Sequence, residues 1–159
     1  MLNNIMTEGE CSKLRSLIHH ANNIVLCCHV SPDGDAIGSV LGMAEVLKCM
    51  GKEPVMVVPD QFPDYLQWLP NTEKIVRYDK RSDYVDMVLK IADLVICLDF
   101  NALSRTDDME AALEACTAPR VLIDHHLNPS IACQVCVSHP NMSSASELVF
   151  RVAWQLGLF

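Results

Sequence analysis

The sequence lacks an apolar run long enough to cross a membrane, and it has fewer basic than acidic residues. No apolar segment reaches the roughly 18 residues that a membrane helix needs, so we expect no membrane partner. The 159 residues include 12 Lys and Arg against 20 Asp and Glu, a formal net charge of −8 at pH 7. This balance argues against a basic groove that follows a nucleic-acid backbone. It leaves phosphorylated substrates open, because bound divalent cations can reverse the local field.

Eight cysteines are present, but a secretory signal peptide and a second C-x-x-C pair are lacking. Cys27, Cys28 and Cys97 lie in apolar, strand-like runs. Their placement favours buried free thiols in a cytoplasmic protein over a disulfide framework. Cys133 and Cys136 form the single C-x-x-C, which we interpret as two thiols on a strand, with a zinc site as the alternative.

Apolar runs alternate with amphipathic segments along the chain. Strands are predicted over residues 24–28, 54–58, 93–100, 120–123 and, as an edge-like strand, 131–137. Helices are predicted over residues 10–21, 36–50, 81–91, 107–116 and 143–156. Strands and helices that alternate with short joins indicate one α/β domain, with a parallel sheet of about five strands and helices on both faces.

Capping and turn residues mark several of these boundaries. Thr7 or Ser12 is the expected cap of the first helix, and Ser82 the expected cap of the third. Gly51 is expected just past the end of the second helix. The segment 59–71 is rich in proline and aromatic residues. It is either a loop anchored by its aromatic side chains or a wall of a substrate cleft.

Acidic and histidine residues directly follow three of the predicted strands. In chain order they are His29, Asp33, Asp35, Asp99, Asp124, His125 and His126. Parallel strands bring their carboxyl ends to one edge of the sheet, where ligands bind. Four carboxylates in one pocket repel each other unless a cation is bound, and Arg105 follows Asp99 by a few residues. Oxygen ligands with some imidazole suit Mn²⁺ or Mg²⁺, and suit Zn²⁺ or Fe²⁺ less well.

Each of these groups alone also has a structural interpretation. A single Asp after a strand commonly caps a helix, and Asp33-Gly34-Asp35 could be an ordinary turn in which Gly34 lets the backbone bend sharply. A pair of histidines more often packs in the protein interior or lies at the surface than binds a metal. The conjunction of three strand ends, each carrying ligand types, favours a metal site.

The motifs resemble those of a known family. H-V-S-P-D-G-D-A-I-G-S at residues 29–39, the strand-final Asp99 and D-H-H at 124–126 resemble the first three motifs of the DHH phosphoesterases. That family includes RecJ-type exonucleases, nano-RNases with pAp phosphatase activity, cyclic-dinucleotide phosphodiesterases and family II inorganic pyrophosphatases. Residues 62–75 and S-S-A-S-E-L at 143–148 further resemble the nano-RNase/pAp phosphatase branch. The resemblance covers almost the whole chain and implies the Rossmann-like, three-layer DHH-domain fold.

The resemblance also implies two Mn²⁺ ions, with Mg²⁺ as the alternative. The first metal would be held by His29, Asp33 and Asp99. The second would be held by Asp35, Asp99 and His125, so that Asp99 bridges the pair.

The same resemblance assigns catalytic and substrate-binding roles. Asp124 would orient the D-H-H triplet, and His126 would face the phosphate as a donor. Ser39, together with the first amides of its helix, is a candidate anion contact. Arg105 is a further candidate for substrate binding.

The sequence departs from the family pattern after its last helix. Family members carry a fourth motif, an Asp that completes the second metal shell, and then a C-terminal substrate-binding domain. Neither is found in these 159 residues. We therefore expect residues 1–159 to be a DHH phosphoesterase domain truncated before the fourth motif, with an incomplete second metal site. The sheet edge exposed by truncation would favour a homodimer.

The function implied is a manganese-dependent phosphoesterase of the cytoplasm. Its substrates would be short single-stranded RNA, pAp or a related small nucleotide such as a cyclic dinucleotide, hydrolysed by two-metal activation of water. An exopolyphosphatase or inorganic pyrophosphatase of the same superfamily is an alternative. A second alternative is a non-catalytic module that binds metal or nucleotide. A third is an interaction domain whose carboxylates are turn and cap residues and which takes up no metal.

Overall fold

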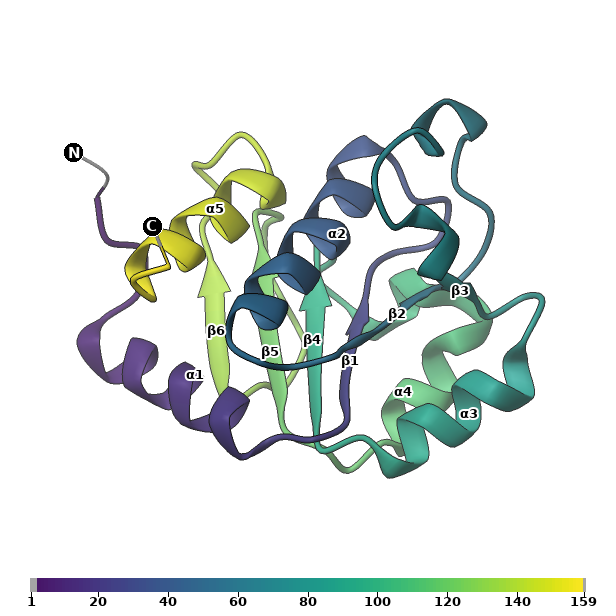
Figure 1. Ribbon diagram of the computed structural model, residues 1–159, viewed down its shortest axis with the longest axis horizontal. Helices are drawn as coiled ribbons and strands as arrows, with labels where there is room; N and C mark the ends of the chain where they lie inside the picture. Colours follow the sequence, from purple (N-terminus) through teal and green to yellow (C-terminus); the bar gives the residue numbers. More distant parts are fainter. Residues whose placement is uncertain (1–2, 159) are drawn as a thin grey trace.

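The computed structural model describes residues 3–158 and contains a sheet of six parallel strands between two layers of helices (Figure 1). The strand order is β3-β2-β1-β4-β5-β6, and every neighbouring pair is parallel. The strands are β1 (Ile24–Cys27), β2 (Val55–Val58), β3 (Val76–Arg77), β4 (Leu94–Leu98), β5 (Arg120–Asp124) and β6 (Val135–Ser138). The predicted α/β architecture is confirmed, with one strand more than expected. The additional strand is β3, whose two residues are too few to form an apolar run.

Helices cover both faces of this sheet, as predicted. Those on one face are α1 (Glu8–His20), α2 (Gly34–Cys49) and α5 (Ala145–Gln155). Those on the other are α3 (Ser82–Ile91) and α4 (Glu110–Ala115). Short 3₁₀ segments lie at Asp64–Leu66 (η1), Thr72–Lys74 (η2) and Leu103–Met109 (η3).

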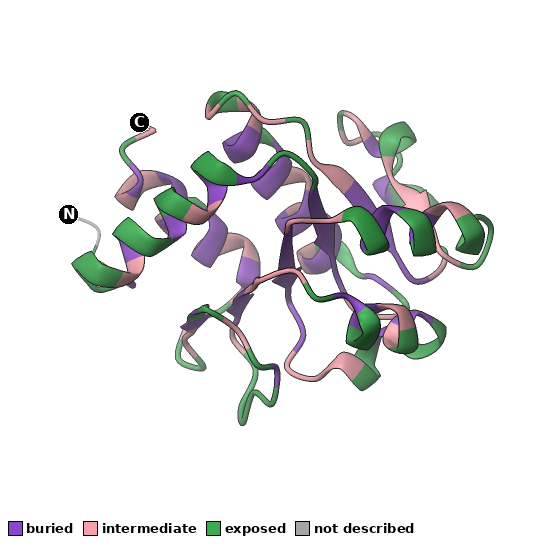
Figure 2. Cartoon of the chain, turned by 90° about the horizontal axis from the view of Figure 1, so that it is seen from below, coloured by how far each residue is buried: buried purple, intermediate pink, exposed green. Residues whose placement is uncertain are grey.

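The two central strands β1 and β4 are apolar throughout because each of their faces packs against helices. In β1, Ile24 and Leu26 point into the core shared with α1, α2 and α5, whereas Val25 and Cys27 point into the core beneath α3 and α4. Figure 2 shows the buried residues gathered in the sheet and on the helix sides that face it. The continuous apolar run in the sequence therefore encodes a strand with no solvated face.

One of the two predicted helix caps is confirmed and the other is not. Thr7 caps α1 in a reciprocal capping box with Glu10, and Ser144 caps α5. The prediction that Ser82 caps α3 is wrong. Ser82 is the first helical residue, and Arg81 occupies the capping position without a side-chain hydrogen bond.

The glycines at the two ends of α2 play different roles. Gly51 has φ +80, as expected for a residue that ends a helix in the left-handed region. Gly34 was expected to provide a sharp turn, but it lies inside the first turn of α2 and its φ is not positive. The turn is instead made by Ser31, whose φ is 51, and Asp33 is the residue that caps the helix.

The cysteines are unpaired, and the three that were predicted to be buried lie in the core. All eight cysteines are free, and Cys27, Cys28 and Cys97 are buried. Burial and the neighbouring Cys136 raise the pKa of Cys133 to about 12, and among residues 3–158 no third ligand joins this pair. No helix in the described part of the chain has both the length and the hydropathy to cross a bilayer.

The strand order also locates the most favourable ligand site. After β1 the chain moves to β2 and β3 on one side, and the later strands β4, β5 and β6 extend the sheet on the other. The switch therefore falls between β1 and β4. In open α/β sheets, ligands bind outside the carboxyl ends of the strands at this switch point.

Candidate metal centre

Asp99 lies at the centre of the cluster, directly after β4. Its side chain is buried, and its N–H donates to the Ile123 carbonyl at the end of β5 over 3.0 Å. Its φ of 64 is a left-handed value that Asp tolerates better than most residues. Nε2 of His29 lies 3.4 Å from Asp99 Oδ2, and Nε2 of His125 lies 3.2 Å from Asp99 Oδ1. Each carboxylate oxygen of Asp99 thus faces a different imidazole.

His29 and Asp33 form the first side of the centre. Nδ1 of His29 lies 2.7 Å from the Val30 carbonyl, which can only accept, so Nδ1 carries the proton. The other nitrogen, Nε2, then faces Asp99 and, at 3.8 Å, Asp33 Oδ1. Asp33 Oδ1 also accepts from the Ala36 N–H at 2.9 Å, which fixes the carboxylate at the start of α2.

His125 and Asp35 form the second side. His125 Nδ1 lies 3.3 Å from the Met142 carbonyl, so its Nε2 is the nitrogen that faces Asp99 and, at 3.5 Å, Asp35 Oδ2. The two oxygens of Asp35 accept from the N–H groups of Ala145 and Ser146, at 2.9 and 2.8 Å. Asp35 therefore joins the first turn of α2 to the first turn of α5.

Asp124 orients His126 through two hydrogen bonds. Asp124 is fully buried, and one of its oxygens lies 2.6 Å from His126 Nδ1. Its other oxygen accepts from the His126 backbone N–H at 3.1 Å. A carboxylate can only accept, so Nδ1 of His126 is its protonated nitrogen and Nε2 is free for a ligand.

Burial and mutual repulsion disturb the ionisation of the central groups. Burial raises the pKa of Asp99, His29 opposes this rise, and the charge of Asp35 adds to it. The hydrogen bond to Asp99 raises the pKa of His29 against the opposing effect of burial. Burial also acts to raise the pKa of Asp35, but the Ala145 and Ser146 hydrogen bonds outweigh it and the pKa is lowered. The cluster favours a positive charge between its carboxylates and imidazoles.

The donors fit divalent cations. In two groups, each residue offers a ligand atom within 4.8 Å of the others: His29 with Asp33 and Asp99, and Asp99 with His125 and His126. Imidazoles whose Nδ1–H is bound to a carbonyl, with Nε2 directed at carboxylates, have the arrangement that metal-ligating histidines adopt. In the described residues no Lys or Arg forms an ion pair with these carboxylates, so no basic side chain supplies the missing positive charge.

The second group differs from the predicted set, because it contains His126 in place of Asp35. Nδ1 of His126 is 3.9 Å from Asp99 Oδ1, but it already donates to Asp124 and has no lone pair to offer. Asp35 lies 3.5 Å from His125 Nε2 and keeps unused lone pairs on both oxygens. On chemical grounds, Asp35 is the better third ligand.

The chain is similar in sequence to known proteins. The family model described as the DHH family, N-terminal domain, matches residues 23–157. The chain belongs to the DHH family. A curated relative, the bifunctional oligoribonuclease and PAP phosphatase NrnA of Thermus thermophilus, is 33% identical over 138 residues, which are 85% of this chain and 37% of that protein.

Two solved structures share the fold. An exopolyphosphatase-related protein from Bacteroides fragilis superposes with a TM-score of 0.95 and 40% identity, over 98% of this chain and 46% of that one. The exonuclease RecJ bound to manganese superposes with a TM-score of 0.54 at 14% identity, over 99% of this chain and 40% of that one, and shows the fold alone. The chain spans less than half the length of these relatives.

Two predicted substrate contacts lie outside the cluster. Ser39 is fully buried, with its hydroxyl 3.3 Å from that of Ser146, so it supports the contact between α2 and α5 rather than facing solvent. Arg105 is exposed, and its carbonyl accepts from the Val30 N–H at 2.7 Å, next to His29. Within residues 3–158 its guanidinium has no hydrogen bond or ion pair.

Two supporting contacts were missed at the sequence level. The N–H groups at the start of α5 bind Asp35, although only the S-S-A-S-E-L resemblance hinted that this segment belongs to the site. Asp60, in the loop after β2, accepts from the Ser31 N–H at 2.7 Å and so fixes the turn between His29 and Asp33. Nothing in the local sequence distinguishes Asp60 from any other loop carboxylate.

Proposed function

We propose that this DHH domain is the catalytic domain of a manganese-dependent phosphoesterase that hydrolyses short oligoribonucleotides, pAp or a related small nucleotide. Cyclic dinucleotides are included in this class, and Mg²⁺ is the alternative cofactor. The observation that carries the proposal is the buried Asp99 carboxylate, with an imidazole Nε2 directed at each of its oxygens. The 33% identity to NrnA supports the substrate class.

The chain's own donors divide into two sets that share Asp99. We assign one cation to His29, Asp33 and Asp99, and a second to Asp35, Asp99 and His125. Two divalent cations, when bound, would make water a stronger nucleophile and stabilise the charge of the phosphate.

The remaining residues position and protonate the substrate. Asp124 holds the His126 ring through Nδ1, and when both ring nitrogens carry a proton, Nε2 can donate to a phosphate oxygen. Arg105, whose guanidinium is unpaired within the described residues, is proposed to bind a more distant phosphate.

The test is hydrolysis of pAp and of a 5′-phosphorylated RNA dinucleotide with and without Mn²⁺. Asp99→Asn removes the shared charge and keeps a residue that tolerates φ 64. A matched control is Asp107→Asn, at an exposed Asp with φ 51 outside the cluster. We expect Mn²⁺-dependent release of mononucleotide or phosphate by the wild type and the control, and none by Asp99→Asn. Equal activity of Asp99→Asn and wild type would contradict the proposal.

A second candidate function is hydrolysis of polyphosphate or pyrophosphate. It is favoured by the 40% identity to the exopolyphosphatase-related protein. Both substrates belong in the same assay, and a preference for polyphosphate over pAp would select this candidate. Uptake of Mn²⁺ without hydrolysis of any of the four substrates would instead indicate a non-catalytic binding module.

A further inference from the structure

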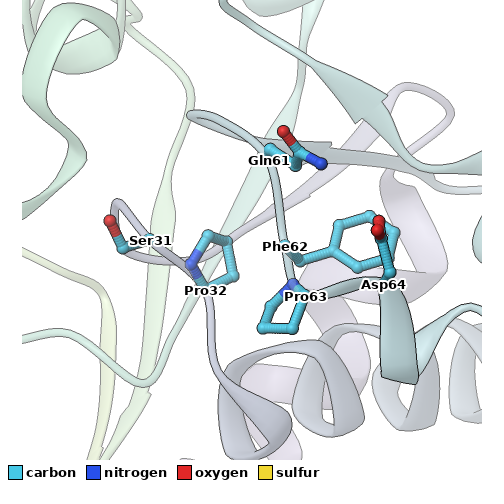
Figure 3. A pocket seen from close by; sticks show the side chains of 6 residues that line it. All are labelled: Ser31, Pro32, Gln61, Phe62, Pro63 and Asp64. Atoms are coloured by element: carbon cyan, nitrogen blue, oxygen red, sulfur yellow. The ribbon is translucent and has the colours of Figure 1, made fainter.

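A cavity of about 420 Å³ opens beside the candidate metal centre. It lies between the turn that follows β1 and the loop that follows β2, and is lined by Ser31, Pro32, Gln61, Phe62, Pro63 and Asp64 (Figure 3). Its volume is within the range of small-molecule sites. Ser31 and Pro32 stand in the sequence between His29 and Asp33, so the cavity and the metal centre share one turn.

Apolar rings line the cavity from both loops. Figure 3 shows the Pro32 ring on one loop and the rings of Phe62 and Pro63 on the other. Phe62 is half-buried against the core, which holds its ring in place, while its remaining surface lines the cavity. Apolar rings of this kind can pack against the face of an aromatic ring.

The rim offers hydrogen-bonding groups that no protein group uses. Within residues 3–158 the Gln61 amide makes no hydrogen bond, and neither does the Ser31 hydroxyl. An amide side chain can both donate and accept, which suits the edge of a heterocyclic base. No Lys or Arg lines the cavity and Asp64 does, so a phosphate group is disfavoured there.

A hydrogen bond joins the two loops that form the cavity. Asp60 accepts from the Ser31 N–H at 2.7 Å, and Ser31 adopts a φ of 51 that is costly for a serine. This hydrogen bond ties the loop after β2 to the turn that carries His29 and Asp33. The cavity is therefore preformed at a fixed place relative to the metal centre.

We propose that this cavity is the nucleobase subsite of the substrate. The base lies against the rings that line the cavity, those of Pro32, Phe62 and Pro63, with its edge toward Gln61, while the phosphate lies toward His29 and Asp33. The assignment rests on the proposed phosphoesterase function and deepens it, because polyphosphate and pyrophosphate have no group that such a cavity would bind. It makes Phe62 and Gln61 binding residues that select nucleotides over inorganic phosphates.

The test compares two probes that differ only in the base, AMP and ribose 5-phosphate, by calorimetry in the presence of Mn²⁺. Stacking on an aromatic side chain commonly adds about tenfold or more in affinity, so we expect AMP to bind about tenfold more tightly than ribose 5-phosphate. Phe62→Ala should abolish this difference and leave the affinity for ribose 5-phosphate unchanged. Tyr65→Ala is the matched control, because Tyr65 is an exposed aromatic residue of the same segment that does not line the cavity.

Gln61→Ala is a second test in case Phe62→Ala fails to fold, since Gln61 is exposed and its side chain has no hydrogen bond to lose within the described residues. It should weaken AMP binding severalfold and spare ribose 5-phosphate. If the wild type binds both probes equally, and neither Phe62→Ala nor Gln61→Ala changes this, the subsite is wrong while the phosphoesterase proposal stands. If the wild type binds neither probe, both proposals fail together.

Discussion

At the scale of single residues, Asp99 is the group on which both halves of the metal centre depend. Asp35 already accepts two backbone N–H groups, whereas Asp33 accepts one, so the cation near Asp35 meets a carboxylate with less free capacity. We therefore predict that calorimetric titration with Mn²⁺ finds two sites of unequal affinity in the wild type. Asp99→Asn should lose both.

The control for this titration is again Asp107→Asn, which should bind Mn²⁺ as the wild type does. Loss of only the weaker site in Asp99→Asn would show that Asp99 is not shared. No uptake by any of the three proteins would mean that the cluster is a set of turn and cap residues.

A second residue-scale prediction concerns the pair formed by Asp124 and His126. Asp124→Asn replaces an acceptor by an N–H₂ group, so one of the two bonds from His126 is lost and its ring is no longer fixed. We expect activity to fall about 10- to 100-fold, as for other residues that orient a metal site. The free energy of unfolding should fall by about 1–3 kcal/mol, because a buried polar group loses its partner.

The readout that separates orientation from simple destabilisation is a double-mutant cycle. If Asp124 acts through His126, Asp124→Asn adds little to the loss of activity caused by His126→Gln. Uptake of Mn²⁺ should remain in all three variants, because neither residue belongs to the proposed ligand sets. If the losses of activity were additive, Asp124 would act independently of His126, and the prediction would be wrong.

At the scale of elements, α2 and α5 meet more closely than their sequences suggest. A Cβ atom at Gly38 would lie 3.0 Å from Ser146 Oγ, and one at Gly42 would lie 3.4 Å from Val149 Cγ1. Ser146 Oγ cannot move without loss of its hydrogen bond to the Asp35 carbonyl at 3.1 Å. The contact between the two helices therefore involves Asp35, the residue whose carboxylate faces His125.

These two glycines form a matched pair for a stability test. Replacing a helical glycine by alanine favours the helix by about 1 kcal/mol. We predict that Gly42→Ala is neutral or stabilising in urea unfolding, and that Gly38→Ala is about 1 kcal/mol less stable than Gly42→Ala because the Ser146 hydrogen bond is strained. Gly38→Ala should also weaken the second Mn²⁺ site. Equal stability of the two variants would mean that Ser146 adjusts freely.

The same elements show what a sequence can and cannot predict here. The sequence predicts β1, β4 and β5 because both faces of each strand are buried, which gives apolar runs. The polar residues that end these runs indicate the edge of the sheet where the site lies. The strand β3 has no such signal in two half-buried residues. The N–H donors to Asp35 and the Asp60 contact are also invisible, because they join segments remote in sequence and use backbone groups or an ordinary loop carboxylate. The predicted homodimer stays a prediction.

At the scale of the whole molecule, the chain has a net charge of −8, and four of its acidic residues gather at the strand ends. Folding must bring Asp33, Asp35, Asp99 and Asp124 together from three separate segments of the chain. Their mutual repulsion opposes that step, and the histidines relieve only part of it. A bound cation therefore stabilises the folded chain far more than the unfolded one, in which the ligands are dispersed.

This linkage gives the last prediction, which is that Mn²⁺ raises the melting temperature. A ligand present at 100 times its Kd stabilises the folded state by about 2.7 kcal/mol, and each kcal/mol shifts the melting of a domain of this size by about 2–4 °C. We expect a rise of roughly 5–10 °C in Mn²⁺, reversed by a chelator and absent in Asp99→Asn. Asp99→Asn without metal should melt no lower than the metal-free wild type, because it removes one of the repelling charges. If Asp99→Asn instead melted far lower than the metal-free wild type, the carboxylate would be a structural group of the fold, and the shared site would have to be assigned elsewhere.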